Sequence, residues 1–68
     1  MRDRDVLVLA VPSDDSAVVM GESREGLMFM QEMFGRNDAP HTIESKMINP
    51  LLEQLRERCL RYSFTSGC

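Results

Sequence analysis

The sequence lacks the features that usually reinforce a small domain. Its 68 residues contain only two cysteines, Cys59 and Cys68, and one histidine, His41. Two cysteines are too few for a disulfide framework, and these three residues do not make the four-ligand set of a structural zinc site. A chain of this length buries roughly 60% of the surface that its unfolded form exposes. We therefore expect one domain, residues 1–68, that gains stability from a second chain.

Charge of one sign and long apolar runs are also scarce. Eleven acidic and eight basic residues give a net charge of −3, and the basic residues form no run. This balance disfavours nucleic-acid binding through phosphate neutralisation. The apolar run Val6–Val11 stops at Pro12 and is too short for a secretory signal or a membrane span. We therefore expect a soluble cytoplasmic protein without a membrane partner, which binds another protein.

Residues that could carry catalysis or hold a metal are few. Four residues in expected loops could build a hydrolytic or metal site: Asp14, Asp15, Asp38 and His41. Their spacing matches no mechanism, and adjacent aspartates are typical of exposed turns. A glycine-rich phosphate loop is also missing. We expect no enzyme activity, no cofactor and no metal, and keep a metal-dependent or hydrolytic site at these loops as a third hypothesis.

Two short apolar segments near the N-terminus predict a β-hairpin. Val6–Val11 is an unbroken β-favouring run, and Ala17–Met20 is a second one that Gly21 closes. Residues 13–16 between them have the composition of a turn. A connection this short favours an antiparallel pair of strands.

The middle of the chain predicts a helix. Ser23 can cap a helix that begins at Arg24, and Gly35 is well placed to end it. Gly26 inside this helix is an unfavourable residue for its position. Residues 36–41 are rich in Asn, Asp and Pro, which indicates a loop.

A second helix follows, and its start is open to two interpretations. Asn49 before Pro50 is typical of a helix start and predicts a helix that runs to about Tyr62. The apolar residues keep helical spacing across the proline, so one helix kinked at Pro50 could instead begin near Thr42. Tyr62 and Phe64 alternate with polar residues, so a short C-terminal strand could join the hairpin edge. The fold class is α+β, in the order ββαα with a possible final strand.

Both faces of the expected hairpin are apolar. Val6, Val8 and Ala10 would face one side of the sheet, and the residues between them the other side. One helix could cover each face within the monomer. Alternatively, both helices could lie on one face and leave the other for a second chain, for example across a two-fold axis in a homodimer.

Each expected helix carries one large apolar residue on its polar side. At 100° per residue, Met28 falls opposite the apolar arc of the first helix, and Leu60 falls among the polar residues of the second. Flexible methionine side chains suit cores and adaptable binding surfaces alike, and Met30 and Met33 neighbour Met28. Cys59 falls on the apolar stripe of the second helix. We predict four partner-binding residues: Met28, Leu60, Met30 and Met33.

These features together favour a non-enzymatic protein–protein interaction module. It would be a small inhibitor or adaptor, of the kind that bacteria and phages encode, which covers a surface of another protein and forms a homodimer. The alternative is a small regulatory nucleic-acid-binding domain that uses three arginines of the last helix: Arg56, Arg58 and Arg61. A steep fall of affinity with salt would favour that alternative.

Overall fold

The computed structural model describes residues 4–67, which form a four-stranded sheet and two α-helices. Two short 3-10 turns, η1 (Pro12–Asp14) and η2 (Ser45–Met47), join some of these elements. The predicted α+β class and the N-terminal hairpin are confirmed. In chain order the main elements are β1 (Val6–Val11), β2 (Ser16–Gly21), α1 (Arg24–Phe34), β3 (His41–Glu44), α2 (Ile48–Glu57) and β4 (Tyr62–Ser66).

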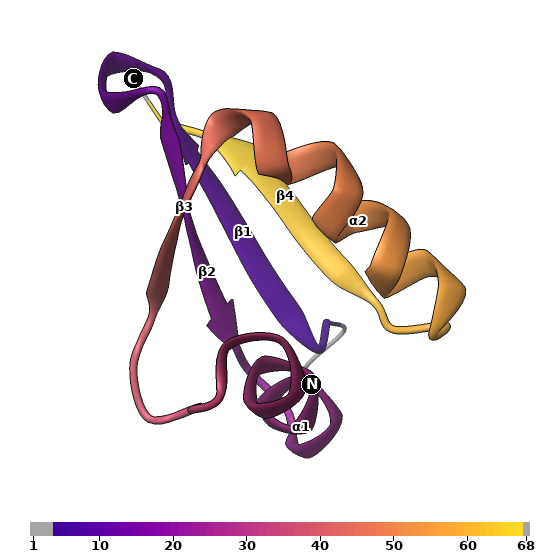
Figure 1. Cartoon of the computed structure of the whole chain (residues 1–68). Helices are drawn as coiled ribbons and strands as arrows, with labels where there is room; N and C mark the ends of the chain where they lie inside the picture. The colour runs from indigo at the N-terminus through magenta and orange to yellow at the C-terminus, as the bar shows by residue number, and fades with distance from the viewer. Residues whose placement is uncertain (1–3, 68) are drawn as a thin grey trace.

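The strands are ordered β3-β2-β1-β4 across the sheet (Figure 1). β1 and β2 pair antiparallel, with Leu9 opposite Val18, and β3 pairs antiparallel with β2. β4 pairs parallel with β1, with Phe64 beside Val8. The predicted C-terminal strand at the hairpin edge is therefore confirmed, and the chain from β2 to α2 provides the long connection that a parallel pair requires.

Both helices pack on the same face of the sheet. Figure 1 shows α2 running beside β4 and α1 lying near the end of β2. Side chains of β1 alternate between buried and half-buried positions, because only one face is covered. One of the two predicted arrangements is thus observed, and the other, with one helix on each face, is wrong. A single core joins strands and helices: Val6, Val8, Ala10, Ala17, Val19, Phe29, Met30, Ile48, Leu51, Leu52 and Leu55.

The first helix begins and ends where the sequence predicts. The Ser23 hydroxyl accepts a hydrogen bond from the backbone N–H of Gly26 at 3.0 Å, and Gly35 ends the helix at φ 80°. Gly26 has a packing role that the sequence did not indicate. A β-carbon at this position would lie 1.8 Å from the backbone oxygen of Asp5, so only glycine lets α1 approach the start of β1 this closely.

The second helix differs from both predictions. β3 and η2 occupy residues 41–47, so the long kinked helix from Thr42 is wrong, and the helix begins at Ile48. Pro50 lies in the first turn, where a missing N–H costs no intrahelical hydrogen bond. The helix ends at Glu57 instead of Tyr62, because Cys59 takes the left-handed conformation at φ 58°.

A buried carboxylate ties three elements together at one end of the sheet. Asp5 is 5% exposed and accepts hydrogen bonds from the Ser23 hydroxyl at 2.5 Å and from the backbone N–H of Arg61 at 3.0 Å. The hydrogen bond from Ser23 and the one from the Arg61 backbone lower the pKa of this carboxyl below its ordinary value. Asp5 therefore joins the start of β1 to the cap of α1 and to the residue before β4.

Candidate protein-binding surfaces

Two of the predicted partner-binding residues meet on the helix side of the molecule. Met28 of α1 is 58% exposed, and Leu60 lies in the loop between α2 and β4, half-buried against the core. Both line a shallow pocket of about 210 Å³ between these segments. Leu60 was expected on the second helix, but the helix ends before it, and its N–H donates to the carbonyl of Leu55 at 2.9 Å. The two residues therefore lie together, and Leu60 is in a loop instead of on the predicted helix.

Charged groups border this Met28–Leu60 pocket. The Arg58 guanidinium lies 5.4 Å from the ring centre of Phe29 and forms an ion pair with Glu32. Glu25 completes the polar rim. Cys59, which was expected as an apolar residue of the helix stripe, is instead exposed beside this site because its backbone conformation takes it off the helix.

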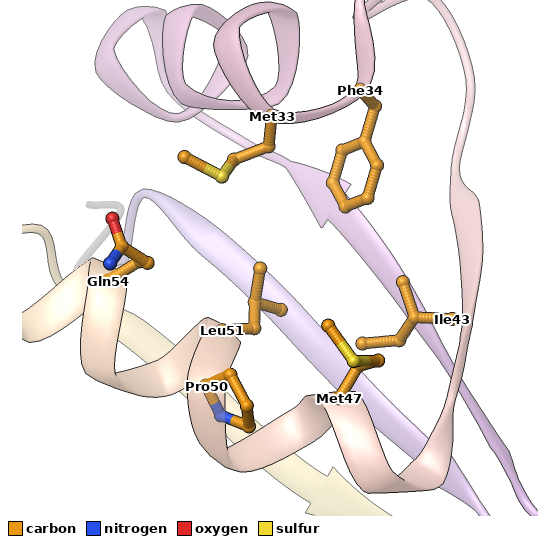
Figure 2. Close-up of a pocket in the computed structure, with 7 residues that line it drawn as sticks. All are labelled: Met33, Phe34, Ile43, Met47, Pro50, Leu51 and Gln54. Atoms are coloured by element: carbon orange, nitrogen blue, oxygen red, sulfur yellow. The ribbon is translucent and has the colours of Figure 1, made fainter.

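Met33 lines a second apolar pocket at the other end of the two helices, also of about 210 Å³. Figure 2 shows its side chain pointing from α1 toward α2, with Phe34 and Ile43 on the side of β3. Gln54 is the one polar residue among the seven that line it; the others are Met33, Phe34, Ile43, Met47, Pro50 and Leu51. Met30 does not share this exposure: it is 1% exposed in the core and is not positioned to contact a partner.

A third apolar surface is the face of the sheet that the helices leave uncovered. We call it the open face and define it by five apolar side chains on the two central strands: Leu7, Leu9, Val11, Val18 and Met20. Polar residues of the two edge strands border it, namely Thr42 and Glu44 on β3 and Ser63 and Thr65 on β4. An apolar centre with a polar rim is the usual composition of a protein interface.

The residues of the hydrolytic or metal hypothesis lie at the two ends of β3. Asp14 and Asp15 border a depression at the hairpin tip together with Glu44. Asp38 lies before the other end of the strand and His41 is its first residue, so the four residues are not brought together. Within residues 4–67, no group of three His, Cys, Asp or Glu side chains could hold a metal ion.

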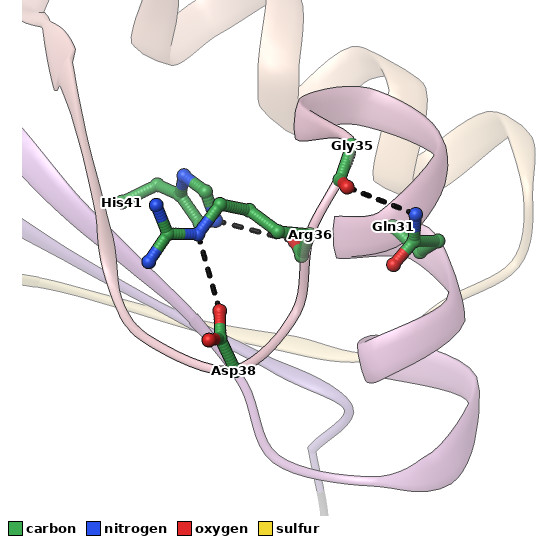
Figure 3. Close-up of polar contacts among 5 residues, drawn as sticks. All are labelled: Gln31, Gly35, Arg36, Asp38 and His41. Carbon is green, nitrogen blue, oxygen red and sulfur yellow. Dashed lines mark hydrogen bonds and ion pairs between the residues drawn. The ribbon is translucent and has the colours of Figure 1, made fainter.

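Local contacts account for Asp38 and His41 (Figure 3). Asp38 pairs with the Arg36 guanidinium at 3.1 Å, and this hydrogen bond lowers the pKa of the Asp38 carboxyl. The His41 ring stacks on Phe34 at 4.5 Å between ring centres, and its Nε2 lies 3.2 Å from the carbonyl oxygen of Arg36. These contacts hold the loop after α1 against the end of that helix.

The three arginines of the nucleic-acid alternative each lie beside a carboxylate. Arg56 pairs with Glu53 at 3.1 Å and donates to the Tyr62 hydroxyl at 2.8 Å. Arg58 pairs with Glu32, and Arg61 lies 3.7 Å from the Asp5 carboxylate. Carboxylates this close offset the positive potential that would attract phosphates.

Comparison with known proteins identified no relative of this chain. No protein-family model matches the chain, and no similar protein was found among curated sequences or among solved structures. Neither helix within residues 4–67 has the length and hydrophobicity needed to cross a membrane.

Proposed function

We propose that this protein is a non-enzymatic interaction module of the cytoplasm, which binds another protein, covers a surface on it and acts as a homodimer. A small inhibitor or adaptor, bacterial or phage-encoded, has this character. The protein acts through side chains on its surface instead of a catalytic centre. Its partner binds the open face.

The observation that carries the proposal is the apolar open face of a four-stranded sheet. Sheets with one solvated face normally alternate apolar and polar residues, so that polar side chains meet water. Here Leu7, Leu9 and Val11 occupy that face of β1, where polar residues would be expected. An apolar patch on a central pair of strands, with a polar rim, supports binding to a protein surface.

The helix side offers a second surface of the same kind. Met28, Leu60 and Met33 lie at its two pockets, and flexible methionines can adapt to different partner surfaces. The Met28–Leu60 pocket has a charged border, and the Met33 pocket is apolar apart from Gln54. We assign them a supporting role, as the site of a second contact when the open face is occupied.

The test compares a substitution at the centre of the open face with one on its rim. Leu9→Asp places a carboxylate in the middle of the patch, and Thr42→Asp adds the same charge on β3 at an already polar, exposed position. Tagged wild-type protein and both variants are used to capture partners from an extract of the source cells. We expect wild type and Thr42→Asp to retain the same proteins, and Leu9→Asp to lose them by at least about tenfold.

Circular dichroism establishes that both variants are folded before capture is compared. If Leu9→Asp is folded and retains the same proteins as wild type, the open face is not the binding surface. The pair Met28→Asp and Leu60→Asp, tested in the same way, then decides whether the helix side binds instead.

A further inference from the structure

The outer edge of β4 has backbone groups that point away from the sheet. In a parallel pair, alternate residues of a strand direct their N–H and C=O toward the neighbour. The N–H of Val6 donates to the carbonyl of Arg61 at 3.2 Å, and the N–H of Gly67 donates to the carbonyl of Ala10 at 2.9 Å. Odd-numbered residues of this segment therefore face β1. The N–H and C=O groups of Tyr62, Phe64 and Ser66 face outward.

This edge lacks the features by which natural sheets avoid pairing with other chains. The strand Tyr62–Ser66 contains no charged residue and no proline. The opposite edge, β3, is protected: it has four residues, follows Pro40 and carries the exposed Glu44 beside Lys46. Only β4 presents an unprotected edge of five residues.

The strand is also self-complementary about its middle residue. Phe64 is the third of the five residues of β4. If a second copy of β4 runs antiparallel with Phe64 opposite its own counterpart, Tyr62 lies opposite Ser66 and Ser63 lies opposite Thr65. The three residues with outward backbone groups then meet one another, and the two Phe64 residues exchange both N–H···O bonds across the axis, as in a hydrogen-bonded antiparallel pair.

We propose that the protein forms a two-fold homodimer by antiparallel pairing of β4 with β4 of a second copy, centred on Phe64. The two four-stranded sheets join into one continuous sheet of eight strands. Phe64 is 46% exposed, and its counterpart supplies an aromatic contact on the axis. No charged side chain of the strand meets its own copy, because Tyr62–Ser66 has none.

Pairing through β4 specifies how the proposed homodimer forms. It rests on the proposed function, in which the protein acts as a homodimer. The two-fold axis of such a pair is perpendicular to the sheet, so both copies keep their helices on one side. Their open faces then lie next to each other on the other side. The dimer presents two apolar patches on one side, separated by the Ser63 and Thr65 side chains of the two β4 strands, which suits a module that covers an extended surface of another protein.

The size of the contact sets the expected strength. Five residues at about 3.4 Å per residue make a strip only about 17 Å long. Stable interfaces bury about 800 Å² on each partner, which is more than this strip supplies. We therefore expect a weak dimer, with a Kd of roughly 10 to 100 µM, that dissociates on dilution.

The first experiment measures solution mass by light scattering over a dilution series. Phe64→Lys and Phe64→Glu each place like charges opposite one another on the axis and should give monomers throughout. An equimolar mixture of the two variants places opposite charges there and should restore the dimer. Thr42→Lys adds the same charge to the β3 edge and should dimerise like wild type.

A second measurement reads the backbone directly. Amide hydrogen exchange by NMR, at high and low protein concentration, should show the amides of Phe64 and Ser66 slowing as the dimer forms. The amides of Ser63 and Thr65, which face β1, should be protected at both concentrations. This alternation distinguishes edge pairing from association through the open face, which leaves outward amides of β4 free to exchange.

The possible failures are distinct. If wild type is a dimer but both Phe64 variants remain dimeric, or the Phe64 amide exchanges equally fast at both concentrations, the β4 interface is wrong and the homodimer stands. If wild type is monomeric up to about 500 µM, both the interface and the homodimer of the proposed function fall. Binding of another protein through the open face is judged separately, by the Leu9→Asp comparison.

Discussion

At the scale of single residues, Asp5 is the polar group that connects three elements at one end of the sheet. Its carboxylate is buried, yet both oxygens have partners, and the N–H of Asp5 donates to the carbonyl of Arg61 at 2.7 Å. A buried charge is tolerated only when it is fully hydrogen-bonded. No buried polar side-chain atom within residues 4–67 lacks a hydrogen-bond partner.

Replacing this carboxylate should make the protein less stable in a pH-dependent way. The lowered pKa of Asp5 means that the folded state favours the charged form, so its contribution is complete above the ordinary value of 3.8. The contribution is lost as the pH falls through the lowered, folded-state pKa. We expect Asp5→Asn to lower the free energy of unfolding by about 2 kcal/mol at pH 7, and the difference from wild type to shrink below about pH 4.

Urea unfolding of both proteins between pH 7 and pH 2.5 measures this difference. Asp38→Asn serves as the control, because its ion pair with Arg36 is exposed and should contribute little to the free energy of unfolding at pH 7. A gap between wild type and Asp5→Asn that stays constant down to pH 2.5 would show that the charge of Asp5 is not what stabilises the fold.

Replacing Gly26 by alanine should change the stability in the direction opposite to that expected from helix propensity. Alanine is favoured over glycine inside a helix by about 1 kcal/mol, so Gly26→Ala would normally stabilise α1. Here the added carbon would lie 1.8 Å from the Asp5 carbonyl oxygen, and α1 must move away from β1. We expect thermal unfolding to show a loss of about 3 kcal/mol or more. An exposed substitution at the start of the helix, Arg24→Ala, should change stability by less than about 0.5 kcal/mol.

At the scale of elements, the end of α2 has a testable conformation. Cys59 is a non-glycine residue in the left-handed region, which costs an L-residue roughly 1 kcal/mol. Cys59→Gly should therefore raise the free energy of unfolding by about 1 kcal/mol in chemical denaturation. If the helix continued through this residue to Tyr62, as its sequence suggested, glycine would instead lower stability by a similar amount. The sign of the change decides between the two.

Elements with strong local signals could be predicted from the sequence, and the others depended on distant partners. Ser23 and Gly35 bound α1 through hydrogen bonds and backbone conformations within their own segment. β3 has four residues with little apolar content, and it exists because β2 offers a free edge. The turn at Cys59 is likewise set by the approach of Arg61 to Asp5, which lies 56 positions away in the chain.

At the scale of the whole molecule, the sequence pattern predicted that both faces of the hairpin are apolar. It did not predict which elements pack on each face. The same alternation in Val6–Val11 fits one helix on each face or two helices on one face, so packing had to decide. The candidate binding residues could likewise be predicted only in part. Helical spacing predicted that Met28 is exposed, whereas it placed Met33 and Met30 on the same apolar arc, of which only Met30 is in the core; the open face came from the sheet topology.

Association should also appear in thermal stability. A dimer that binds only the folded chain raises the unfolding midpoint as protein concentration increases. We expect the wild-type midpoint to rise by roughly 5 °C between about 5 and 500 µM, and that of Phe64→Lys to stay constant. Differential scanning calorimetry at several concentrations measures this shift. Equal slopes for the two proteins would contradict self-association at β4.

The parallel pairing of β1 with β4 has a consequence for how the chain folds during synthesis. Among the elements of residues 4–67, β1 is the first to leave the ribosome, but its partner on one side, Tyr62–Ser66, is the last. The central strand must wait with one edge unpaired, and contacts between such distant residues also slow folding. The nascent chain is therefore most exposed to mispairing and to chaperones just before residue 66 appears.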